Sequence, residues 1–220
     1  MDKSLDNREL VITEIYPSIQ GESSFAGRPC SFIRLTGCPL RCRWCDTAYG
    51  FAGGTKYSVE SVVQEIKSLG INLVEITGGE PLAQENCLLL MQALIDEEFE
   101  VICETSGSEC IETVPEGVTL IMDLKCPGSG MVEKNLWKNI EYLKPKDEIK
   151  FVIADRADFD WTVDICHEYQ LLARHQVLVS VAFGQLNPAT LVEWILESEL
   201  PLRLNLQQHK YIWSPRKKGV

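Results

Sequence analysis

The feature that most constrains the fold is a regular alternation of short apolar segments with longer amphipathic segments. Within residues 58–69, Val59, Val62, Val63 and Ile66 recur at the spacing that places them on one face of a helix. Short strands that alternate with such helices are typical of a parallel sheet joined by helical crossovers. The expected strands cover residues 9–16, 31–35, 73–77, 101–104, 119–122, 149–153, 176–182 and 202–206, and the expected helices cover 58–69, 87–97, 135–143, 158–169 and 188–199.

The length of the chain narrows the choice among parallel α/β folds. Its 220 residues, 45% of them apolar, are enough for one sizeable core. A complete eight-fold barrel typically takes about 250 residues. We therefore predict an α/β fold with a single domain over residues 1–220, a partial (open) barrel of about six parallel strands with reduced helices.

Unusual polar groups follow several of the expected strands. They are Gly78-Gly79-Glu80-Pro81, Glu104-Thr105-Ser106-Gly107, Asp123-Leu124-Lys125 and Gln207-Gln208-His209-Lys210. Ligands of parallel α/β folds bind outside the carboxyl ends of the strands, so we expect these groups to meet at one mouth. The two glycines also fit an ordinary strand–helix turn, but they would let a ligand approach the backbone closely, and Glu80 could accept from an ammonium.

A loop with three closely spaced cysteines follows the expected strand 31–35. Cys38, Cys42 and Cys45 have the spacing C-x3-C-x2-C, so their sulfurs can point at one centre. Thiolates select soft metals and iron–sulfur clusters. A cubic iron–sulfur cluster has four ligand positions, and a fourth nearby cysteine is missing from the sequence. This loop therefore predicts a cluster with one iron open to a non-protein ligand.

Zinc binding and thiol redox chemistry are the alternatives to a cluster at the cysteine loop. A structural zinc site needs a second cysteine pair or a histidine pair, and His167, His175 and His209 do not supply one at finger spacing. A thioredoxin-like redox pair would use Cys42 and Cys45 but would leave Cys38 without a role. The three-thiolate cluster is the hypothesis that uses all three cysteines.

Charge and cysteine usage exclude several classes of partner and location. The net charge is −11, and the one compact basic run is Arg216-Lys217-Lys218, so a nucleic-acid partner is not expected. Apolar runs stay below the roughly 18 residues of a membrane helix, so no membrane is expected either. The nine cysteines have irregular spacing and the N-terminus is polar, which favours a reducing, cytoplasmic location.

The motifs together resemble a known superfamily. The C-x3-C-x2-C loop after an early strand, with Gly78-Gly79-Glu80-Pro81 after a later one, is similar to the radical S-adenosylmethionine (SAM) superfamily. Asp46-Thr47, Gln20-Gly21-Glu22 and the ending Gln207 to Tyr211 resemble the 7-carboxy-7-deazaguanine synthase family within it. The resemblance covers nearly the whole chain.

The resemblance implies roles for individual residues. It implies that Cys38, Cys42 and Cys45 hold a 4Fe–4S cluster and that Thr47 ligates Mg²⁺. It assigns SAM binding to Trp44, Cys45, Asp46, Gly79, Glu80, Asp123, Leu124, Lys125, Ser180, Val181, Ala182 and Phe183. It assigns substrate binding to Ile19, Gln20, Gly21, Glu22, Arg34, Thr77, Glu104, His209 and Pro215.

The activity that the resemblance implies is that of a carbon–nitrogen lyase in queuosine biosynthesis. The family converts 6-carboxy-5,6,7,8-tetrahydropterin to 7-carboxy-7-deazaguanine by radical ring contraction with loss of ammonia. A 5′-deoxyadenosyl radical made from SAM starts the reaction, so the protein has no catalytic side chain of its own in this scheme and mainly positions groups and excludes water. The resemblance also implies a one-electron reductant such as flavodoxin or ferredoxin, and a homodimer.

The chain departs from the family pattern at three places. Asp123-Leu124-Lys125 stands where the family often has Ser-Pro-Lys, and Val181 stands where it has a proline. Some members end at the proline that matches Pro215, whereas this chain continues from Arg216 to Val220. The first two differences lie among the implied SAM contacts.

Several of these residues could equally serve an ordinary structural role. Arg34 could form a bidentate fork to a substrate carboxylate or pair with a carboxylate of the core. Thr47 could offer magnesium a hard oxygen or cap a turn, and Asp46 could form an Asx turn. His209 could be a hydrogen-bonded structural histidine.

Two different functions remain as alternatives. A glycyl-radical enzyme activase is also short and also carries C-x3-C-x2-C, but it acts on a protein. Gln20-Gly21-Glu22 and the Gln207–Tyr211 ending argue against it. A non-catalytic iron–sulfur or zinc protein would have no need of the Gly78-Gly79 turn.

Overall fold

The computed structural model describes residues 8–220. Over this part of the chain the strands form one nine-stranded sheet in the order β3-β1-β2-β4-β5-β6-β7-β8-β9. The strands are β1 (Glu9–Ile19), β2 (Pro29–Leu35), β3 (Thr55–Ser58), β4 (Leu73–Gly78), β5 (Glu100–Thr105), β6 (Thr119–Asp123), β7 (Glu148–Ile153), β8 (Gln176–Val181) and β9 (Arg203–Leu204).

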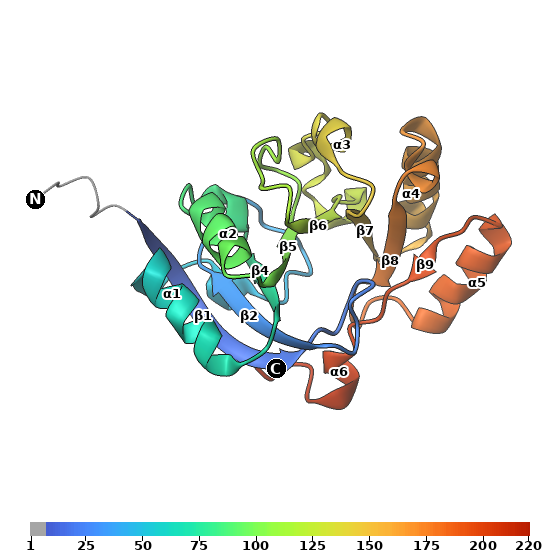
Figure 1. Cartoon of the computed structure of the whole chain (residues 1–220). Coiled ribbons are helices and arrows are strands. Elements are labelled where there is room, and N and C mark those ends of the chain that lie inside the picture. The colour runs from blue at the N-terminus through green and yellow to red at the C-terminus, as the bar shows by residue number, and fades with distance from the viewer. Residues whose placement is uncertain (1–7) are drawn as a thin grey trace, which may run out of the picture.

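The sheet is parallel from β2 onward and antiparallel at its N-terminal edge. β1 pairs antiparallel with both β2 and β3, and each pair from β2–β4 to β8–β9 is parallel. The sheet curves into an open half-barrel (Figure 1). The predicted open α/β barrel is therefore confirmed. The predicted count of about six parallel strands is one short, because β2 and β4 to β9 make seven.

Helices cover the convex side of the curved sheet, and the last short helix lies toward its open side (Figure 1). They are α1 (Val59–Leu69), α2 (Cys87–Asp96), α3 (Asn139–Tyr142), α4 (Arg156–Glu168), α5 (Pro188–Ser198) and α6 (His209–Ile212). α1 begins after Ser58, which caps it by accepting from the Ser61 amide, and ends at Gly70 in the left-handed conformation. None of the helices in residues 8–220 has the length and apolar character of a membrane span.

Alternation along the strands divides the side chains between two layers. In β5, Cys103 joins the main core under the helices, whereas Ile102 joins a small apolar cluster inside the barrel. That inner cluster also contains Tyr16, Phe32, Leu73, Ile121 and Leu178. Because side chains two residues apart share a face, the next inward positions toward the strand ends stand above this apolar floor. The floor thus supports a ring of polar side chains.

The expected helix over 135–143 was wrong for its first half. α3 spans only Asn139–Tyr142. Asn135 exchanges two hydrogen bonds with the backbone of Lys125, and Asn139 donates to the carbonyls of Gly107 and Glu109. Side-chain amides that bond to backbone in this way compete with helix formation.

The remaining differences from the predicted elements concern the two edge strands β3 and β9, the end of β1, and the short helix α6. β3 and α6 were not predicted, and both are only four residues long. β9 has two residues instead of the expected five, and β1 extends to Ile19. Short edge segments carry weak periodicity, and here long-range pairing decides them.

Candidate active site

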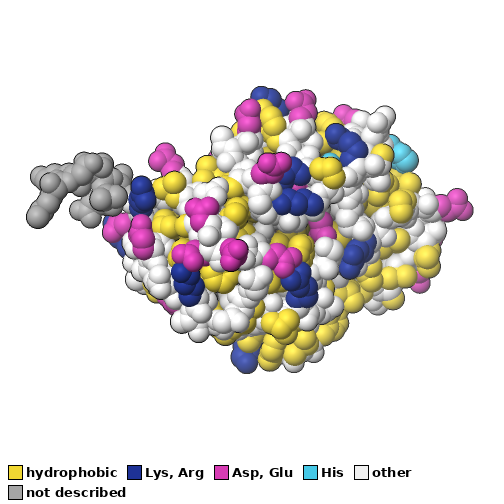
Figure 2. All heavy atoms as spheres, in the orientation of Figure 1, with side chains coloured by type: hydrophobic (Ala, Val, Ile, Leu, Met, Phe, Trp, Pro, Cys, Tyr) yellow, Lys and Arg dark blue, Asp and Glu magenta, His cyan; other side chains and the backbone are white. Residues whose placement is uncertain are grey.

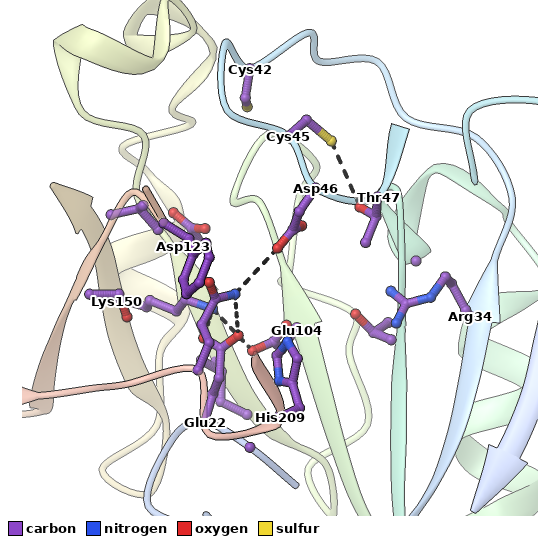
Figure 3. A pocket seen from close by; sticks show the side chains of 18 of the residues that line it. Glu22, Arg34, Cys42, Cys45, Asp46, Thr47, Glu104, Asp123, Lys150 and His209 are labelled. Atoms are coloured by element: carbon purple, nitrogen blue, oxygen red, sulfur yellow. Dashed lines mark hydrogen bonds and ion pairs between the residues drawn. The ribbon is translucent and has the colours of Figure 1, made fainter. Parts of the chain in front are cut away.

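One cavity of about 510 Å³ opens at the carboxyl ends of the parallel strands. Its lining includes all three residues of the cysteine motif, the loop after β1, inward side chains of β2 and of β4 to β8, and the C-terminal segment. Figure 3 shows the cysteines at one end of this cavity and Glu22 and His209 at the other. The polar groups predicted to meet at one mouth therefore do meet there.

The cysteine loop is pressed against the glycine turn after β4. The Glu80 amide donates to the Gly37 carbonyl at 2.9 Å, and the Gly37 amide donates to the Gly50 carbonyl at 2.8 Å. A Cβ on Gly79 would lie 2.1 Å from the Gly37 oxygen and 2.6 Å from the Cys38 Cβ. Position 79 must be glycine for this close approach, which joins the two motifs that the sequence analysis singled out.

The three thiols of the loop are free and partly exposed to the cavity. The Leu40 amide points at the Cys38 sulfur at 3.4 Å, and the Cys45 sulfur lies 3.7 Å from the Thr47 hydroxyl. Burial raises the pKa of the Cys38 and Cys42 thiols, and the nearby Lys125 ammonium partly offsets this. Amide donors and a buried cation are what a thiolate-bound cluster needs around it.

The cysteine geometry differs from that of a mononuclear metal site. Within residues 8–220, no three His, Cys, Asp or Glu side chains converge closely enough to hold a single metal ion. Three thiolates on one cube each meet a different iron, so a cluster separates them more widely. The loop therefore fits a cluster better than the zinc alternative.

Beside the cysteines, Asp123 presents an unpaired oxygen. Its Oδ2 lies 2.8 Å from the Lys125 ammonium, while its buried Oδ1 has no hydrogen-bond partner in the described part of the chain. A buried acceptor without a partner is rare and marks a position for a donor from a ligand. Of the residues expected at SAM, those that line the cavity are Trp44, Cys45, Asp46, Gly79, Asp123, Lys125, Ser180, Val181, Ala182 and Phe183.

The positions of Glu80 and Leu124 do not fit the contact with SAM that was expected of them. Neither belongs to the cavity lining, and both have 0% exposure. The Glu80 carboxylate accepts from the Leu82 amide, the Thr105 hydroxyl, and the amide and hydroxyl of Ser106. With four donors on its two oxygens, Glu80 ties the glycine turn to the end of β5 instead of meeting an ammonium. Leu124 faces the core.

Asp46 is anchored by the C-terminal segment and not by its own turn. The Lys210 ammonium lies 2.5 Å from Asp46 Oδ2, and the Gln207 amide reaches the same oxygen at 3.4 Å. Burial would raise the pKa of this carboxyl, but Lys210 and Gln207 hold it below its usual value. These bonds replace the Asx turn that was the structural alternative.

Thr47 begins the 3-10 helix Ala48–Gly50 without capping it. Its side chain makes no capping hydrogen bond there, although its backbone carbonyl accepts from the Gly50 amide at 2.8 Å. The hydroxyl lines the cavity beside Cys45. A turn-cap role for the hydroxyl therefore has no support.

Arg34 pairs with a carboxylate and also lines the cavity. Its Nε donates to Glu14 Oε1 at 2.7 Å and its Nη2 donates to the Tyr16 hydroxyl at 3.0 Å. The same Glu14 oxygen accepts from Tyr49 at 2.7 Å. Arg34 nevertheless lines the cavity, so Glu14 fixes the guanidinium while part of its fork faces the interior. Figure 3 shows Arg34 across the cavity from Lys150.

A buried charge network forms the wall opposite Arg34. The Lys150 ammonium pairs with Glu22 Oε2 and lies 3.3 Å from Glu104 Oε1 (Figure 3). Gln207 Nε2 donates to Glu22 Oε1 at 2.9 Å. Burial opposes ionisation, but Lys150 and Gln207 hold the pKa of Glu22 below its usual value. Burial raises the pKa of Glu104, and Lys150 offsets this only in part.

Glu75 and Lys150 are cavity residues that the sequence analysis missed. Glu75 accepts from the Gln20 side chain, and burial together with the nearby Glu104 and Glu22 charges raises its pKa well above the usual value. The sequence pattern could have identified both residues. Glu75 lies two residues before Thr77 in an expected strand, and Lys150 interrupts the apolar strand 149–153, so each is a charged inward position.

The loop after β1 is closed by the C-terminal helix. The Gln208 amide donates to the Gly21 carbonyl at 2.9 Å. A Cβ on Gly21 would lie 2.7 Å from His209 Nδ1, so this glycine lets the imidazole pack over the loop. Burial lowers the pKa of His209, although Glu22 counteracts it, so the environment favours the neutral imidazole.

The expected substrate-side residues all reach the cavity. Ile19, Gln20, Gly21, Glu22, Arg34, Thr77, Glu104, His209 and Pro215 belong to its lining. Arg216 and Val220, which follow Pro215, line it as well, and the Lys218 ammonium lies 4.0 Å from the centre of the Tyr49 ring. The C-terminal extension thus folds back over the part of the cavity that contains Arg34 and the expected substrate-side residues.

Comparison with known proteins decides the family. The profile of the radical SAM superfamily matches residues 32–123. The 7-carboxy-7-deazaguanine synthase of Koribacter versatilis is 45% identical over 95% of this chain and 99% of its own length. The enzyme of the same name from Chlorobaculum tepidum is 41% identical over 96% of this chain and 97% of its own. The chain belongs to the 7-carboxy-7-deazaguanine synthase family.

The solved structures agree on the fold. The crystal structure of QueE from Escherichia coli superimposes with a TM-score of 0.75 over 91% of this chain and 95% of that one, at 24% identity. Family membership makes this chain a radical SAM enzyme with a 4Fe–4S cluster and SAM. Its residues fit both groups, because three free thiols and the unpaired Asp123 oxygen line the same cavity.

Proposed function

We propose that this enzyme converts 6-carboxy-5,6,7,8-tetrahydropterin to 7-carboxy-7-deazaguanine and ammonia, a step of queuosine biosynthesis. Product and ammonia together contain all atoms of the substrate, so the ring contraction needs no net oxidant. The observation that carries the proposal is the single cavity that joins the cysteine loop to a second region, where Arg34 faces a wall that contains Glu22 and Glu104. A cofactor at one end and a small polar ring at the other would lie in contact there.

Cys38, Cys42 and Cys45 would hold the cluster, which would supply the electron for reductive cleavage of SAM and so the hydrogen-atom abstraction that starts the ring contraction. The chain's own task is to hold SAM and to orient the substrate carbon toward it. The unpaired Asp123 Oδ1 supports an acceptor role toward a hydroxyl or ammonium of SAM. The apolar floor of Phe32, Ile102 and Ile121 supports exclusion of water from beneath the ring.

On the substrate side, opposite walls offer complementary groups. Arg34 can give a charged donor to the substrate carboxylate or to its ring oxygen. Across the cavity, the carboxylate of Glu104 can accept from the N–H groups of the 2-amino-4-oxo edge, and we assign Glu22 to the same side of the pterin as the anchor of that wall. We assign Ile19 to Gly21, Thr77, His209 and Pro215 to the remaining contacts with the pterin.

We assign a magnesium ion to Thr47, because its hydroxyl faces the cavity without a capping bond and magnesium prefers hard oxygen ligands shared with a substrate. Thr47→Ala should slow turnover, and added magnesium should restore part of the rate. Thr47→Ser keeps the hydroxyl and is the matched control. Wild-type rates for Thr47→Ala at every magnesium concentration would remove Thr47 from the metal site.

Two partners complete the proposal. The electron comes from a small one-electron carrier such as flavodoxin or ferredoxin, since the enzyme holds no other redox group in this scheme. A homodimer would cover exposed apolar side chains near α6: Tyr211 is 59% and Ile212 is 56% exposed. Figure 2 shows hydrophobic atoms gathered along the lower edge of the view, toward α6.

The decisive experiment is anaerobic incubation of the reconstituted enzyme with SAM, a reductant and 6-carboxytetrahydropterin, followed by mass spectrometry. We expect a product that is lighter than the substrate by one ammonia, in the absence of any protein partner. A glycyl-radical activase would leave the pterin unchanged and would need a protein substrate. A non-catalytic cluster protein would not bind SAM in a titration.

A further inference from the structure

The cavity wall opposite Arg34, here called the pterin wall, contains more carboxylates than cations. Glu22, Glu75 and Glu104 all line the cavity, and Lys150 is the ammonium that lies among them, with its side chain only 8% exposed. It pairs with Glu22 and lies 3.3 Å from Glu104 (Figure 3). One buried cation is thus shared between carboxylates from two distant parts of the chain.

The two carboxylates that share Lys150 are not equivalent. Glu22 is saturated: Oε1 accepts from Gln207 at 2.9 Å, and Oε2 accepts from Lys150 and from Asn205 at 3.2 Å. Among the described residues 8–220, Glu104 is bonded through Oε1 alone, and its side chain is 25% exposed toward the cavity. Glu22 therefore anchors the wall, whereas Glu104 keeps an oxygen for a ligand.

We propose that Lys150 is a positioning residue for the reaction, which locks Glu104 against the fixed Glu22 so that the second oxygen of Glu104 faces the N–H groups of the pterin ring. The inference rests on the proposed function and deepens it, because it assigns the ring edge to Glu104 and its placement to Lys150.

The sheet explains why Lys150 can serve both carboxylates. Lys150 lies in β7 directly beside Asp123 of β6 and is separated from Glu104 of β5 by that one strand. Asp123 already has its own cation, Lys125, at 2.8 Å. The Lys150 ammonium therefore pairs with Glu104 and with Glu22 of the loop after β1, and not with the adjacent Asp123.

Removing the ammonium would place two buried carboxylates near each other without a shared cation. Like charges in a desolvated site disfavour ionisation, so a proton would be taken up. Burial already raises the pKa of Glu104 and Lys150 lowers it in part, so loss of Lys150 would raise that pKa further. A protonated Glu104 would be a weaker acceptor for the N–H groups of the ring than the carboxylate is.

Five other titratable groups lie near Lys150. They are Asp46 of the cluster loop, Glu75 of β4, Asp123 of β6, Lys125 of the turn after β6, and His209 of α6. Asp46 and Asp123 have cations of their own, and Glu75 has the Gln20 amide. Glu22 and Glu104 remain as the groups that depend on Lys150.

The test compares Lys150→Met, which keeps length without charge, with Lys150→Arg, which keeps the charge. Steady-state kinetics from pH 6 to 9 give KM for the pterin and kcat. A separate titration gives the dissociation constant of SAM. We expect Lys150→Met to raise KM for the pterin roughly ten- to a hundredfold at neutral pH, the effect of losing one charged hydrogen bond. SAM affinity should be unchanged, and Lys150→Arg should recover part of the loss.

The pH profile separates positioning from a merely structural role. In Lys150→Met the acidic limb of 1/KM should move to higher pH, because binding needs an ionised Glu104. The Glu104→Gln variant should raise KM by itself and abolish that limb, and adding Lys150→Met to it should have little further effect. Lys56→Met, which removes an exposed pair with Glu9, is the matched control and should leave all these values unchanged.

The outcomes that overturn the proposal are distinct from failure of the proposed function. If the wild type does not convert the pterin, the proposed function fails. If the wild type does convert it and Lys150→Met keeps the same KM and pH profile, Lys150 has no positioning role. Should Lys150→Met not fold, a Glu104→Gln variant with unchanged KM and an unchanged acidic limb overturns the assignment equally.

Discussion

The cluster end of the cavity and its opposite end, called the pterin end after the substrate proposed for it, are built in different ways. The cluster end comes from one continuous loop, in which Cys38, Cys42, Cys45 and Thr47 lie within ten residues. The pterin end takes Glu22, Glu75, Glu104 and Lys150 from four separate segments that only the sheet brings together. A local loop leaves a readable motif in the sequence, whereas an assembled wall leaves single charged residues inside strands.

The two ends also differ in how complete they are without ligands. At the cluster end, backbone bonds hold the loop while three thiols and Asp123 Oδ1 remain without strong partners. At the pterin end, Lys150, Gln207 and Asn205 satisfy Glu22, and Glu14 fixes Arg34. The first region depends on its cofactors for completion, and the second is pre-organised for a small ring.

The largest effect is expected at the cluster end. Cys42→Ala removes one of only three thiolates, so the variant should lose the visible iron–sulfur chromophore and all turnover after anaerobic reconstitution. Cys110→Ala, which changes an exposed cysteine outside the cavity, should keep both. An unchanged visible spectrum in Cys42→Ala would show that the cluster is held elsewhere.

The second largest effect, on stability, is expected at Glu80, which ties the glycine turn beside the cysteine loop to the end of β5. Glu80→Ala leaves the buried donors of Leu82, Thr105 and Ser106 without an acceptor. We expect a loss of about 2–4 kcal/mol in the free energy of unfolding, which corresponds to a melting temperature lower by roughly 5–15 °C for a chain of this size.

The control for Glu80 is its exposed neighbour Glu85, whose replacement by Ala should change stability by no more than about 0.5 kcal/mol. SAM affinity should fall in Glu80→Ala only as far as the glycine turn is disturbed. A variant with normal melting temperature but weakened SAM binding would restore the direct contact that the buried position of Glu80 argues against.

The same contrast determines how much the sequence could predict. The alternation of apolar and amphipathic segments predicted the open α/β barrel, and the spacing of the cysteines predicted the cluster loop. Glu80 was assigned to SAM because it follows two glycines, but the sequence could not show that Thr105 and Ser106 would claim its oxygens. Such saturation is a property of long-range packing.

Lys150 and the first half of the expected helix 135–143 illustrate the remaining gap. The alternating face of β7 could have identified Lys150 as an inward charge, but its partners come from β5 and from the loop after β1. Asn135 and Asn139 fit the helical spacing, yet their amides bond to backbone of Lys125 and Gly107. Tertiary hydrogen bonds overrode local helix propensity at residues 135–138, whereas at Lys150 the strand was predicted correctly and only the distant partners could not be.

At the pterin end, Arg34 should show an intermediate effect. Arg34→Ala should raise KM for the pterin roughly ten- to a hundredfold, since a charged hydrogen bond contributes about 1.5–3 kcal/mol. Arg34→Lys should recover only part of this, because an ammonium cannot keep Glu14 and Tyr16 bonded and also present a fork. Arg28→Ala, which breaks an exposed pair with Glu100, is the control. Full activity in Arg34→Ala would leave the residue a purely structural role, as the partner of Glu14.

The smallest effect is expected from the C-terminal extension, which covers the pterin end without belonging to its charged wall. The Lys218 ammonium lies over the Tyr49 ring, and Tyr49 donates to the Glu14 oxygen that also holds Arg34. An exposed cation–π contact contributes about 0.5–1 kcal/mol, so Lys218→Ala should raise KM for the pterin about two- to fivefold. Lys217→Ala, which lies over Trp213, is the matched control and should leave KM unchanged. A change of more than about tenfold in Lys218→Ala would mean that the extension is part of the binding wall itself and not only a cover over it.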